Sequence, residues 1–301
     1  MRALATGRVA TQPRGSVRGR TLNGARRRRV CYEPTMRLVP AASLIALLAC
    51  GCPHGSKTRP YPEPTVEELL GRLAATRAHV TSFSAETVMD YWMNDQRVKG
   101  TVLVMGTTGS KVRINALSPA GNDMIADLAC DGQRYAFLDK DKNCQLAGAC
   151  SQETIASLFG IALAPDEFVQ LAVGGTPVIS GATGTLRWDG KAGKEVLELK
   201  GDGDRTQTIV LDARDGRADV VSSEVKDAAG VQEWRVDNTG FAKVDDANGV
   251  PFRVPEKSRL RTPGKNADLL VDWRERVLNL ALTDDKFALE VDPGIPTCQP
   301  Q

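Results

Sequence analysis

The sequence predicts a mainly β protein of the α+β class: a long antiparallel meander with one N-terminal helix and short helices near the middle of the chain. Apolar and polar residues alternate with a period of two in many successive short segments, the pattern of strands with one buried face. Turn sequences rich in Gly, Asn and Asp separate these segments. Helical spacing of apolar residues is confined to three short stretches.

A helix is predicted where regular structure begins. Thr65 and Glu68 match a capping box, in which the two side chains satisfy backbone N–H groups at a helix start. Leu69, Leu70 and Leu73 follow at helical spacing. We therefore expect one amphipathic helix directly after Thr65.

A first series of strands follows this helix. Its clearest member runs from Lys111 to Ala116, where Val112 and Ile114 alternate with charged or polar residues. Short turns join neighbouring segments, which predicts a β-meander. The predicted strands are 83–93, 98–105, 111–116, 124–130 and 134–138.

Two short helices are expected next, at 152–159 and 166–172, after Ser151 and Pro165. A second series of strands completes the chain. Its predicted members are 185–188, 195–200, 206–212, 218–226, 232–236, 241–245, 252–260 and 269–280. Because no fixed-period repeat and no Pro/Gly/Ser-rich linker divides the two series, residues 65–301 are predicted to form a single domain.

Charge is distributed unevenly along the chain. The formal net charge is +2, but residues 1–35 carry nine arginines and one acid, Glu33. From Cys50 onward there are 29 basic and 36 acidic side chains, a net charge of −7. An acidic body without a Lys/Arg cluster argues against a nucleic-acid partner. Residues 1–35 are either a basic nucleic-acid arm or sequence upstream of a true start at Met36, and the segment that follows favours the second.

Residues 36–49 have the anatomy of a signal peptide: a charged start, the 12-residue apolar run Leu38–Ala49, and small residues before a cysteine. Spanning a bilayer as a helix takes about 20 apolar residues, so this segment is too short for a permanent anchor. The sequence Leu47-Leu-Ala-Cys50 resembles the bacterial lipobox, whose cysteine receives lipid. Cys50 is therefore the predicted lipidation site. Cys52 is a poorer rival, and an ordinary secretory cleavage site is the alternative.

Residues 50–64 are predicted to be a lipidated tether. Their four prolines, with Gly, Ser and charged residues, favour an extended chain that builds no core. Two or more acyl chains anchor a protein stably, so the expected location is a membrane surface of the cell envelope. The residue after Cys50 is Gly51 and not Asp. In lipoproteins of a Gram-negative envelope, the absence of Asp at this position favours the outer membrane, so we expect the protein there, facing the periplasm.

Five cysteines follow Cys50. They form no Cys-x-x-Cys pair, and the chain has only two histidines, so we predict no metal site and no cofactor. In an oxidising envelope, these cysteines are more simply explained as disulfide partners. Cys144 and Cys150 would close a small loop, whereas Cys130 and Cys144 would staple a hairpin. Spacing leaves both open, and we prefer Cys144–Cys150.

The order of elements resembles the lipoprotein-carrier family of the Gram-negative envelope, the LolA/LolB-like proteins. Three segments carry the resemblance: Thr81-Ser-Phe-Ser-Ala-Glu86, Val112-Arg-Ile-Asn-Ala-Leu-Ser-Pro-Ala-Gly121, and Phe287-Ala-Leu-Glu-Val-Asp-Pro-Gly294. It spans roughly Thr65 to Pro296. It implies a strongly curved sheet that forms an incomplete barrel, or half-barrel, closed by helices, whose apolar interior holds acyl chains.

Period-two alternation selects the residues expected to face that interior. They are Met89, Tyr91, Val112, Ile114, Met124, Leu128, Trp234 and Val236. A curved sheet with an apolar inner face must be filled either by side chains or by a guest. Whether these residues line an open ligand cavity or simply pack as a core is left open by the alternation.

Sequence motifs of catalysis are missing. The chain contains no Gly-x-Ser-x-Gly, no His-Glu-x-x-His and no phosphate-binding Gly-rich loop, so we expect no enzyme activity and no catalytic residues. Two functions remain. The first is a lipid or lipoprotein carrier or receptor in envelope biogenesis that binds acyl chains in its cavity, and the second is a scaffold lipoprotein whose sheet binds an unidentified protein partner.

Overall fold

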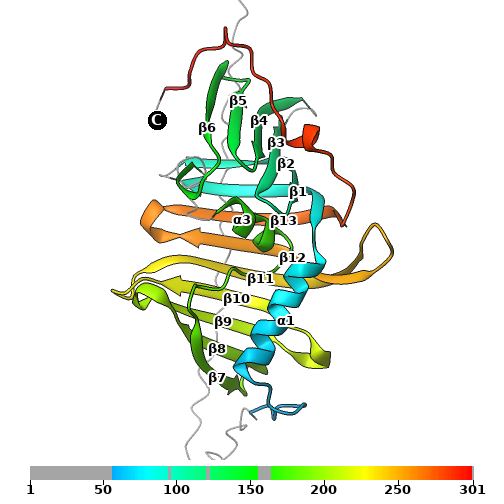
Figure 1. The fold of residues 1–301 in the computed structure, drawn as a ribbon, viewed down its shortest axis with the longest axis vertical. Helices are drawn as coiled ribbons and strands as arrows, with labels where there is room; N and C mark the ends of the chain where they lie inside the picture. Colours follow the sequence, from blue (N-terminus) through cyan, green and yellow to red (C-terminus); the bar gives the residue numbers. More distant parts are fainter. Residues whose placement is uncertain (1–55, 94–95, 120–122, 155–163, 300–301) are drawn as a thin grey trace, which may run out of the picture. The chain divides into compact units, whose positions relative to one another are not determined.

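A computed structural model of the chain describes residues 56–93, 96–119, 123–154 and 164–299, all of which belong to one compact unit. These residues form a 13-stranded sheet in which every strand is antiparallel to its neighbours (Figure 1). The strands are β1 Ser82–Met93, β2 Gln96–Thr107, β3 Lys111–Leu117, β4 Met124–Asp131, β5 Arg134–Asp139, β6 Cys144–Ala149, β7 Thr183–Asp189, β8 Lys194–Lys200, β9 Thr206–Asp212, β10 Asp219–Lys226, β11 Gln232–Asp245, β12 Pro251–Thr262 and β13 Ala267–Leu278.

Two meanders share this sheet. Its order is β6-β5-β4-β3-β2-β1-β13-β12-β11-β10-β9-β8-β7, so each half follows chain order and the first strand pairs with the last. Met89 lies opposite Val271 in this central pairing, and Tyr91 lies opposite Leu269. Directly opposite residues project from the same face. The β1–β13 pairing therefore joins the apolar faces of both halves into one surface.

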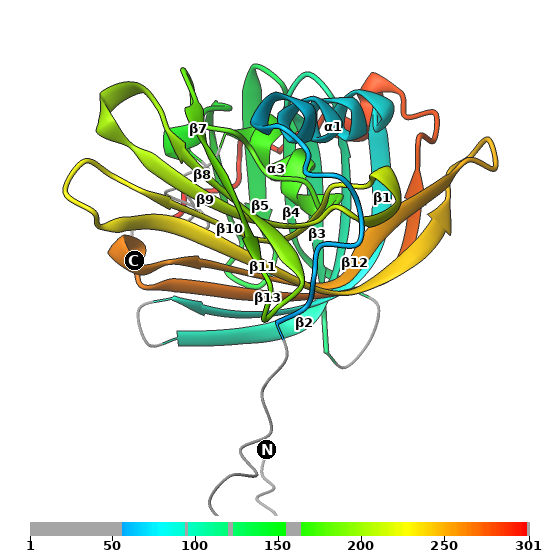
Figure 2. The ribbon, with the colours of Figure 1, turned by 90° about the horizontal axis from the view of Figure 1, so that it is seen from below.

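The sheet curves strongly without closing into a barrel, and helices α1 and α3 lie on the concave side (Figure 2). Helix α1, Val66–His79, begins as predicted after Thr65, whose Oγ1 accepts a hydrogen bond from the backbone N–H of Glu68 at 3.1 Å. Helix α3, Pro165–Ala172, matches the predicted helix at 166–172. The mainly β, incomplete-barrel fold is thus confirmed. Neither of these helices is long and apolar enough to cross a membrane.

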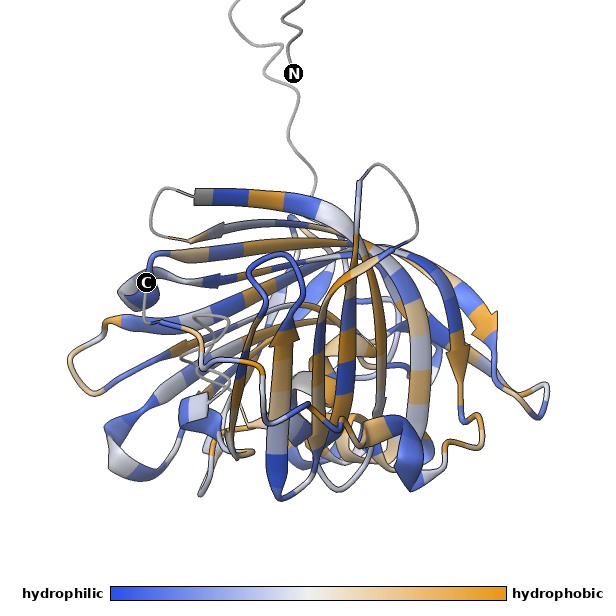
Figure 3. Cartoon of the chain, turned by 90° about the horizontal axis from the view of Figure 1, so that it is seen from above, coloured by the Kyte–Doolittle hydropathy of each residue, from blue (hydrophilic) through white to orange (hydrophobic). Residues whose placement is uncertain are grey.

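The two faces of the sheet differ in chemistry, because apolar and polar residues alternate along its strands (Figure 3). The main apolar core lies between the concave face and the helices, where Leu69 and Leu73 of α1 are buried. The opposite face carries cross-strand ion pairs, such as Arg259 with Asp268 at 2.6 Å. The main apolar core therefore lies on the concave face of the sheet.

Two strand predictions needed correction. The segments 232–236 and 241–245 belong to one strand, β11, which continues through Gly240 at φ +67°. Glycine adopts this left-handed conformation at little cost, so the strand is not interrupted there. Residues 144–149, expected as a loop, form strand β6.

The disulfide prediction Cys144–Cys150 is wrong. These cysteines lie at opposite ends of β6, so about 20 Å of extended chain separates them, whereas disulfide-bonded Cα atoms lie within about 7 Å. Cys150 pairs instead with Cys130 of β4, and Cys144 pairs with Cys298. The alternative Cys130–Cys144 is excluded by the same two pairings.

The Cys144–Cys298 disulfide fixes the C-terminal segment to the outer edge of β6. Gln145 donates its backbone N–H to Pro296 O at 2.9 Å, and Cys298 donates its own to Gln145 O at 2.9 Å. Unpaired sheet edges are prone to join other chains. This segment therefore covers one of the two edges of the sheet.

Part of the predicted tether is packed against the sheet. We call residues Ser56–Pro64 the strap. Arg59 forms two hydrogen bonds with Glu195, a fully buried residue of β8. Tyr61 packs edge to face with Trp188 at 6.0 Å between ring centroids, and its burial, with Glu195 nearby, raises its pKa to about 12. The composition of the strap suggested a free linker because it did not reveal these partners.

The predictions for residues 1–35, the signal peptide at 36–49 and lipidation at Cys50 lie outside the described residues. The same holds for residues 155–159, the larger part of the helix predicted at 152–159.

Candidate functional site

The concave face gathers seven of the eight residues predicted to point inward. Val112 of β3 and Leu128 of β4 are almost fully buried, and Ile114 lies directly opposite Leu128. The central strand β1 contributes Met89 and Tyr91, both packed against the main core. Trp234 and Val236 of β11 are buried members of that core. Alternation thus found the inner face on both halves of the sheet.

Met124 does not belong to this group. The β3–β4 register shifts between Ala116 and Leu117, which lie opposite Ala126 and Met124 respectively. A bulge of this kind changes the face to which the following side chains point. The Met124 sulfur consequently lies 3.5 Å from Nδ2 of Asn115. The Asn115 side chain projects from the outer face of the sheet, whereas that of Ile114 projects from the concave face. The prediction that Met124 faces the interior is wrong for this reason.

A small cavity remains between α3 and the centre of the concave face. Its volume is about 30 Å³, room for about one water molecule. Two of the predicted residues, Met89 and Val236, line it, and α3 closes it with Leu171 and Ala172. The other lining residues come from β12 and β13: Ser258, Leu260, Leu269, Val271 and Trp273. In this conformation the space beneath α3 is therefore much smaller than an acyl chain requires.

The polar groups at the cavity wall form a connected chain. Trp273 donates Nε1–H to Ser258 Oγ at 3.0 Å, and Ser258 donates in turn to Asn238 Oδ1 at 2.8 Å. Asn238 Nδ2 donates to the backbone oxygen of Val220 at 3.0 Å. These groups are buried, so the hydrogen bonds offset their loss of hydration. The cavity is thus lined mainly by apolar side chains, and the polar atoms of Trp273, Ser258 and Asn238 form hydrogen bonds within the wall.

Helix α3 covers the cavity as a short, separately anchored element. Leu171 and Ala172 contact the sheet through apolar side chains. Gln170 donates Nε2–H to Thr176 O at 2.7 Å, a hydrogen bond to the loop after the helix. That loop is fixed to the sheet by Gln207, which donates Nε2–H to Pro177 O at 2.7 Å. Among the described residues, the polar contacts of α3 thus run to α1 and to its own loop, not to the strands beneath it.

The same loop approaches the sheet closely at one glycine. Gly174 has φ +84°, and a Cβ atom there would lie 2.3 Å from Cδ of Pro255 on β12. Only glycine combines this backbone conformation with so close a contact. The loop after α3 is therefore seated on Pro255.

Arg276 is a buried charge on the concave face beside this loop. The β1–β13 register shifts so that Ala85 lies opposite Arg276 while Thr87 lies opposite Trp273. The extra residue leaves Arg274 exposed and turns Arg276 inward, where it is only 8% exposed. Simple alternation from Trp273 would have placed Arg276 on the outer face.

Sequence reasoning missed several residues of this site. Leu269, Val271 and Trp273 alternate within the predicted strand 269–280, so the sequence contained the signal for them. Arg276 gave no such signal, because a bulge within Trp-Arg-Glu-Arg has no sequence pattern of its own.

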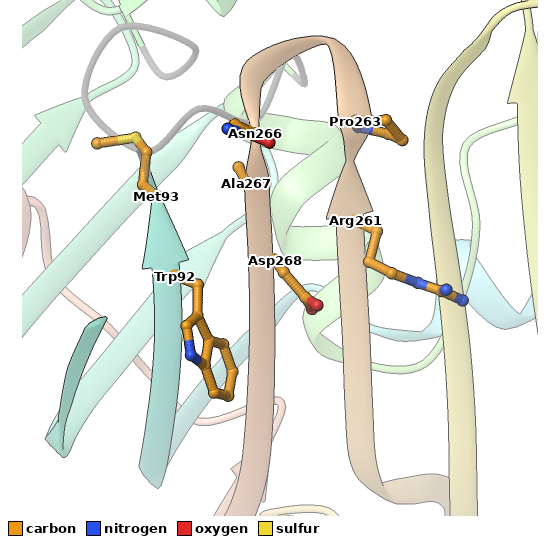
Figure 4. Close-up of a pocket in the computed structure, with 7 residues that line it drawn as sticks. All are labelled: Trp92, Met93, Arg261, Pro263, Asn266, Ala267 and Asp268. Atoms are coloured by element: carbon orange, nitrogen blue, oxygen red, sulfur yellow. The ribbon is translucent and has the colours of Figure 1, made fainter. Parts of the chain in front are cut away.

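A second, open depression lies at the rim of the sheet, at the ends of β1, β12 and β13 (Figure 4). Its volume is about 320 Å³. Trp92, Asp268 and Arg261 project from three neighbouring strands into it, and the guanidinium of Arg97 stacks on the Trp92 ring at 4.9 Å. This mixed lining differs from the apolar cavity under α3.

No family model and no curated protein matches the chain. Among solved structures, a LolA superfamily protein from Nitrosomonas europaea is similar at 12% identity and a TM-score of 0.49, covering 75% of this chain and 99% of that one. A putative outer membrane lipoprotein-sorting protein domain from Vibrio parahaemolyticus is similar at 11% identity and a TM-score of 0.47, covering 73% and 94%. A DUF1329 family protein from Desulfovibrio piger is similar at 12% identity and a TM-score of 0.49, covering 75% and 98%.

Proposed function

We propose that this chain is a lipid-anchored envelope protein, without enzyme activity, that binds an acyl chain between helix α3 and the concave face of its sheet. Cys50 carries the anchor, and the domain faces the periplasm from the outer membrane. The two disulfides support an oxidising compartment outside the cytoplasm, because such bonds are rare in reducing cytosol.

The position of the small cavity carries the binding proposal. It lies at the boundary between α3 and strands β1, β11, β12 and β13, and the residues that line it are almost all apolar. Removing α3 would therefore expose a continuous apolar surface at the centre of the sheet. Since α3 has only eight residues, its removal would leave the strand pairing intact.

Binding requires α3 to leave its position. Ligand sites for small molecules have volumes of about 300–1,000 Å³, some ten or more times larger than the cavity present. An acyl chain would replace the apolar contacts of Leu171 and Ala172 with its own. The ligand thus selects a conformation in which α3 is displaced, and its affinity is reduced by the free energy of that displacement.

The small volume of the cavity under α3 favours a second candidate function, a scaffold that binds a protein partner. In this reading the concave core only stabilises the sheet. The partner would contact the outer surface, where the depression at Trp92 and Arg261 is an open concavity of about 320 Å³. The two candidates differ in whether lipid accompanies the protein.

Purification of the protein from its native envelope, followed by mass spectrometry under non-denaturing and denaturing conditions, tests the choice. We expect one noncovalent acyl-chain lipid per protein, released on denaturation. Retention of no lipid near stoichiometry would overturn the binding proposal and leave the scaffold function.

The anchor is tested separately with Cys50→Ala. This substitution should abolish the mass added by acylation and release the protein from membranes washed at high salt. Sedimentation of the variant with washed membranes would show that the anchor lies elsewhere. Cys52→Ala is the matched control and should leave both properties unchanged.

A further inference from the structure

Arg276 is a buried arginine that has no carboxylate partner among the described residues. Buried Glu195 pairs with Arg59, and buried Asp127 pairs with Arg113 at 2.6 Å. Among the residues that the structure describes, no carboxylate lies within ion-pair distance of the Arg276 guanidinium. Its burial without a counter-charge lowers its pKa to about 10.

The guanidinium is held in place but most of its donors are unused. Nη2 donates to the backbone oxygen of Pro255 at 2.7 Å, and the guanidinium carbon lies 4.4 Å from the ring centroid of Trp273. Nε and Nη1 are buried and have no hydrogen-bond acceptor among the described residues. A buried charged donor without an acceptor is strongly unfavourable. The position therefore favours any ligand that brings an anionic oxygen.

Trp273 connects this donor group to the apolar cavity. One side of the indole lines the cavity under α3, and its ring also stacks with Arg276. The loop after α3 lies over Pro255, which holds Nη2. Displacement of α3 with its loop would thus open the apolar surface and the unused donors together.

We infer that Arg276 binds the anionic head group of a single-chain amphiphile whose hydrocarbon chain occupies the space under α3. Guanidinium groups match the oxygens of carboxylate and phosphate in geometry and charge. A free anion would gain the same hydrogen bonds but would lose its hydration in an apolar interior without burying any hydrocarbon. The inference rests on the proposed function, because it assigns the ligand class of the same site.

Binding of two ligands with the same chain tests it. The full chain carrying Cys50→Ala is purified without detergent and stripped of lipid on a hydrophobic resin. Its affinities for dodecanoate and for dodecan-1-ol are measured by calorimetry, below the critical micelle concentration of dodecanoate and the solubility limit of dodecan-1-ol, with acetate as the anion without a chain. We expect dodecanoate to bind about tenfold more tightly than dodecan-1-ol, the ratio that one charge-assisted hydrogen bond provides, and acetate not to bind.

Variants of two neighbouring arginines assign the preference. Arg276→Met should reduce the ratio to about one without weakening dodecan-1-ol, and Arg276→Lys should retain part of it. Arg274→Met, at an exposed position of the same strand, should keep the full ratio. Circular dichroism confirms the fold of each variant.

Each failure has a distinct meaning. Binding of neither amphiphile to the unsubstituted chain would overturn the proposed function itself. Three outcomes would overturn the role of Arg276 in an amphiphile site. The unsubstituted chain could bind both amphiphiles equally, or the preference for dodecanoate could survive Arg276→Met. The third outcome is that acetate binds as tightly as dodecanoate. The comparison on the unsubstituted chain decides whether either amphiphile binds and whether both bind equally, even if Arg276→Met does not fold.

Discussion

Arg59 and Glu195 are joined by two hydrogen bonds, Nε to Oε1 at 2.8 Å and Nη2 to Oε2 at 3.1 Å, although 136 residues separate them in sequence. Glu195 is fully buried, and the hydrogen bond to it raises the pKa of Arg59. The pair fixes the strap to strand β8. It thereby determines where the chain leaves the domain toward its proposed anchor at Cys50.

Loss of the Arg59 side chain should destabilise the domain, because it leaves the Glu195 carboxylate buried and unpaired. We expect Arg59→Ala to lower the free energy of unfolding by about 3 kcal/mol, measured by urea denaturation. Arg187→Ala is the control, since Arg187 and Glu198 form an exposed pair at 2.9 Å on the adjoining strands, and it should cost less than about 1 kcal/mol. Equal effects of the two substitutions would contradict a special role for the strap.

The disulfide pairing predicts a defined peptide map. Non-reducing digestion with a protease that cleaves after Leu146 separates Cys144 from Cys150. Mass spectrometry should then find Cys130 linked to Cys150 and Cys144 linked to Cys298. A peptide pair linking Cys144 to Cys150 would contradict the structure. Cys298→Ser should leave the sheet folded and make the chain after Phe287 more sensitive to limited proteolysis.

Acid should weaken the domain partly through Asp212. Hydrogen bonds from Arg214 and Lys194 hold the pKa of this carboxyl well below its usual range, despite its burial. Because the unfolded-state pKa is about 3.9, the stabilisation is complete above about pH 5 and is lost as the pH falls through 4 toward the folded-state pKa. The free energy of unfolding should therefore fall by roughly 1–2 kcal/mol less between pH 5 and pH 2 in Asp212→Asn than in the unsubstituted protein.

Urea denaturation at several pH values measures this effect. Asp215→Asn replaces an exposed carboxylate nearby and should preserve the slope of the unsubstituted protein. An unchanged slope in Asp212→Asn would show that other carboxylates account for the acid sensitivity.

Weakening the contact between α3 and the sheet should increase acyl-chain affinity. Leu171→Ala removes a buried side chain at the cavity and should lower the free energy of unfolding by about 3 kcal/mol. If α3 must leave for a ligand to bind, each 1.4 kcal/mol of weakened docking should tighten apparent binding about tenfold. Calorimetric titration with dodecanoate measures it.

Leu197→Ala is the matched control for that experiment. Leu197 is fully buried on β8 and does not line the cavity, so its loss should destabilise the domain similarly without changing affinity. Weaker binding to Leu171→Ala would mean that the Leu171 side chain contacts the ligand and that α3 stays in place.

The sequence was sufficient for the architecture and insufficient for the details of the site. Period-two alternation identified both strand series, and the Thr65 cap identified the start of α1. It failed where the backbone departs from regular pairing, since a bulge reversed the expected face of Met124 and another turned Arg276, which had not been singled out, inward. Strand β6, rich in Ala and Gly, lacks the β-branched and aromatic residues that predict strands, so its cysteines were assigned to a loop.

The filling of the interior also could not be read from the sequence. Alternation predicts that Met89 and Val236 face inward, but whether space remains beside them depends on where α3 rests. The contact of Leu171 and Ala172 with these strands is a tertiary relationship between distant segments.

The pairing of β1 with β13 has a consequence for how the chain reaches its fold. Phe83 must meet Leu278, so the first meander is complete long before the strand that covers its open edge has been made. Another 129 residues, from Ala149 to Leu278, must follow, which takes roughly 6–26 seconds at a synthesis rate of roughly 5–20 residues per second. During this time its apolar face and unpaired backbone groups are available to other chains. Folding of this protein is therefore expected to be slow and to depend on assistance that keeps nascent chains apart, up to the moment when its last strand arrives.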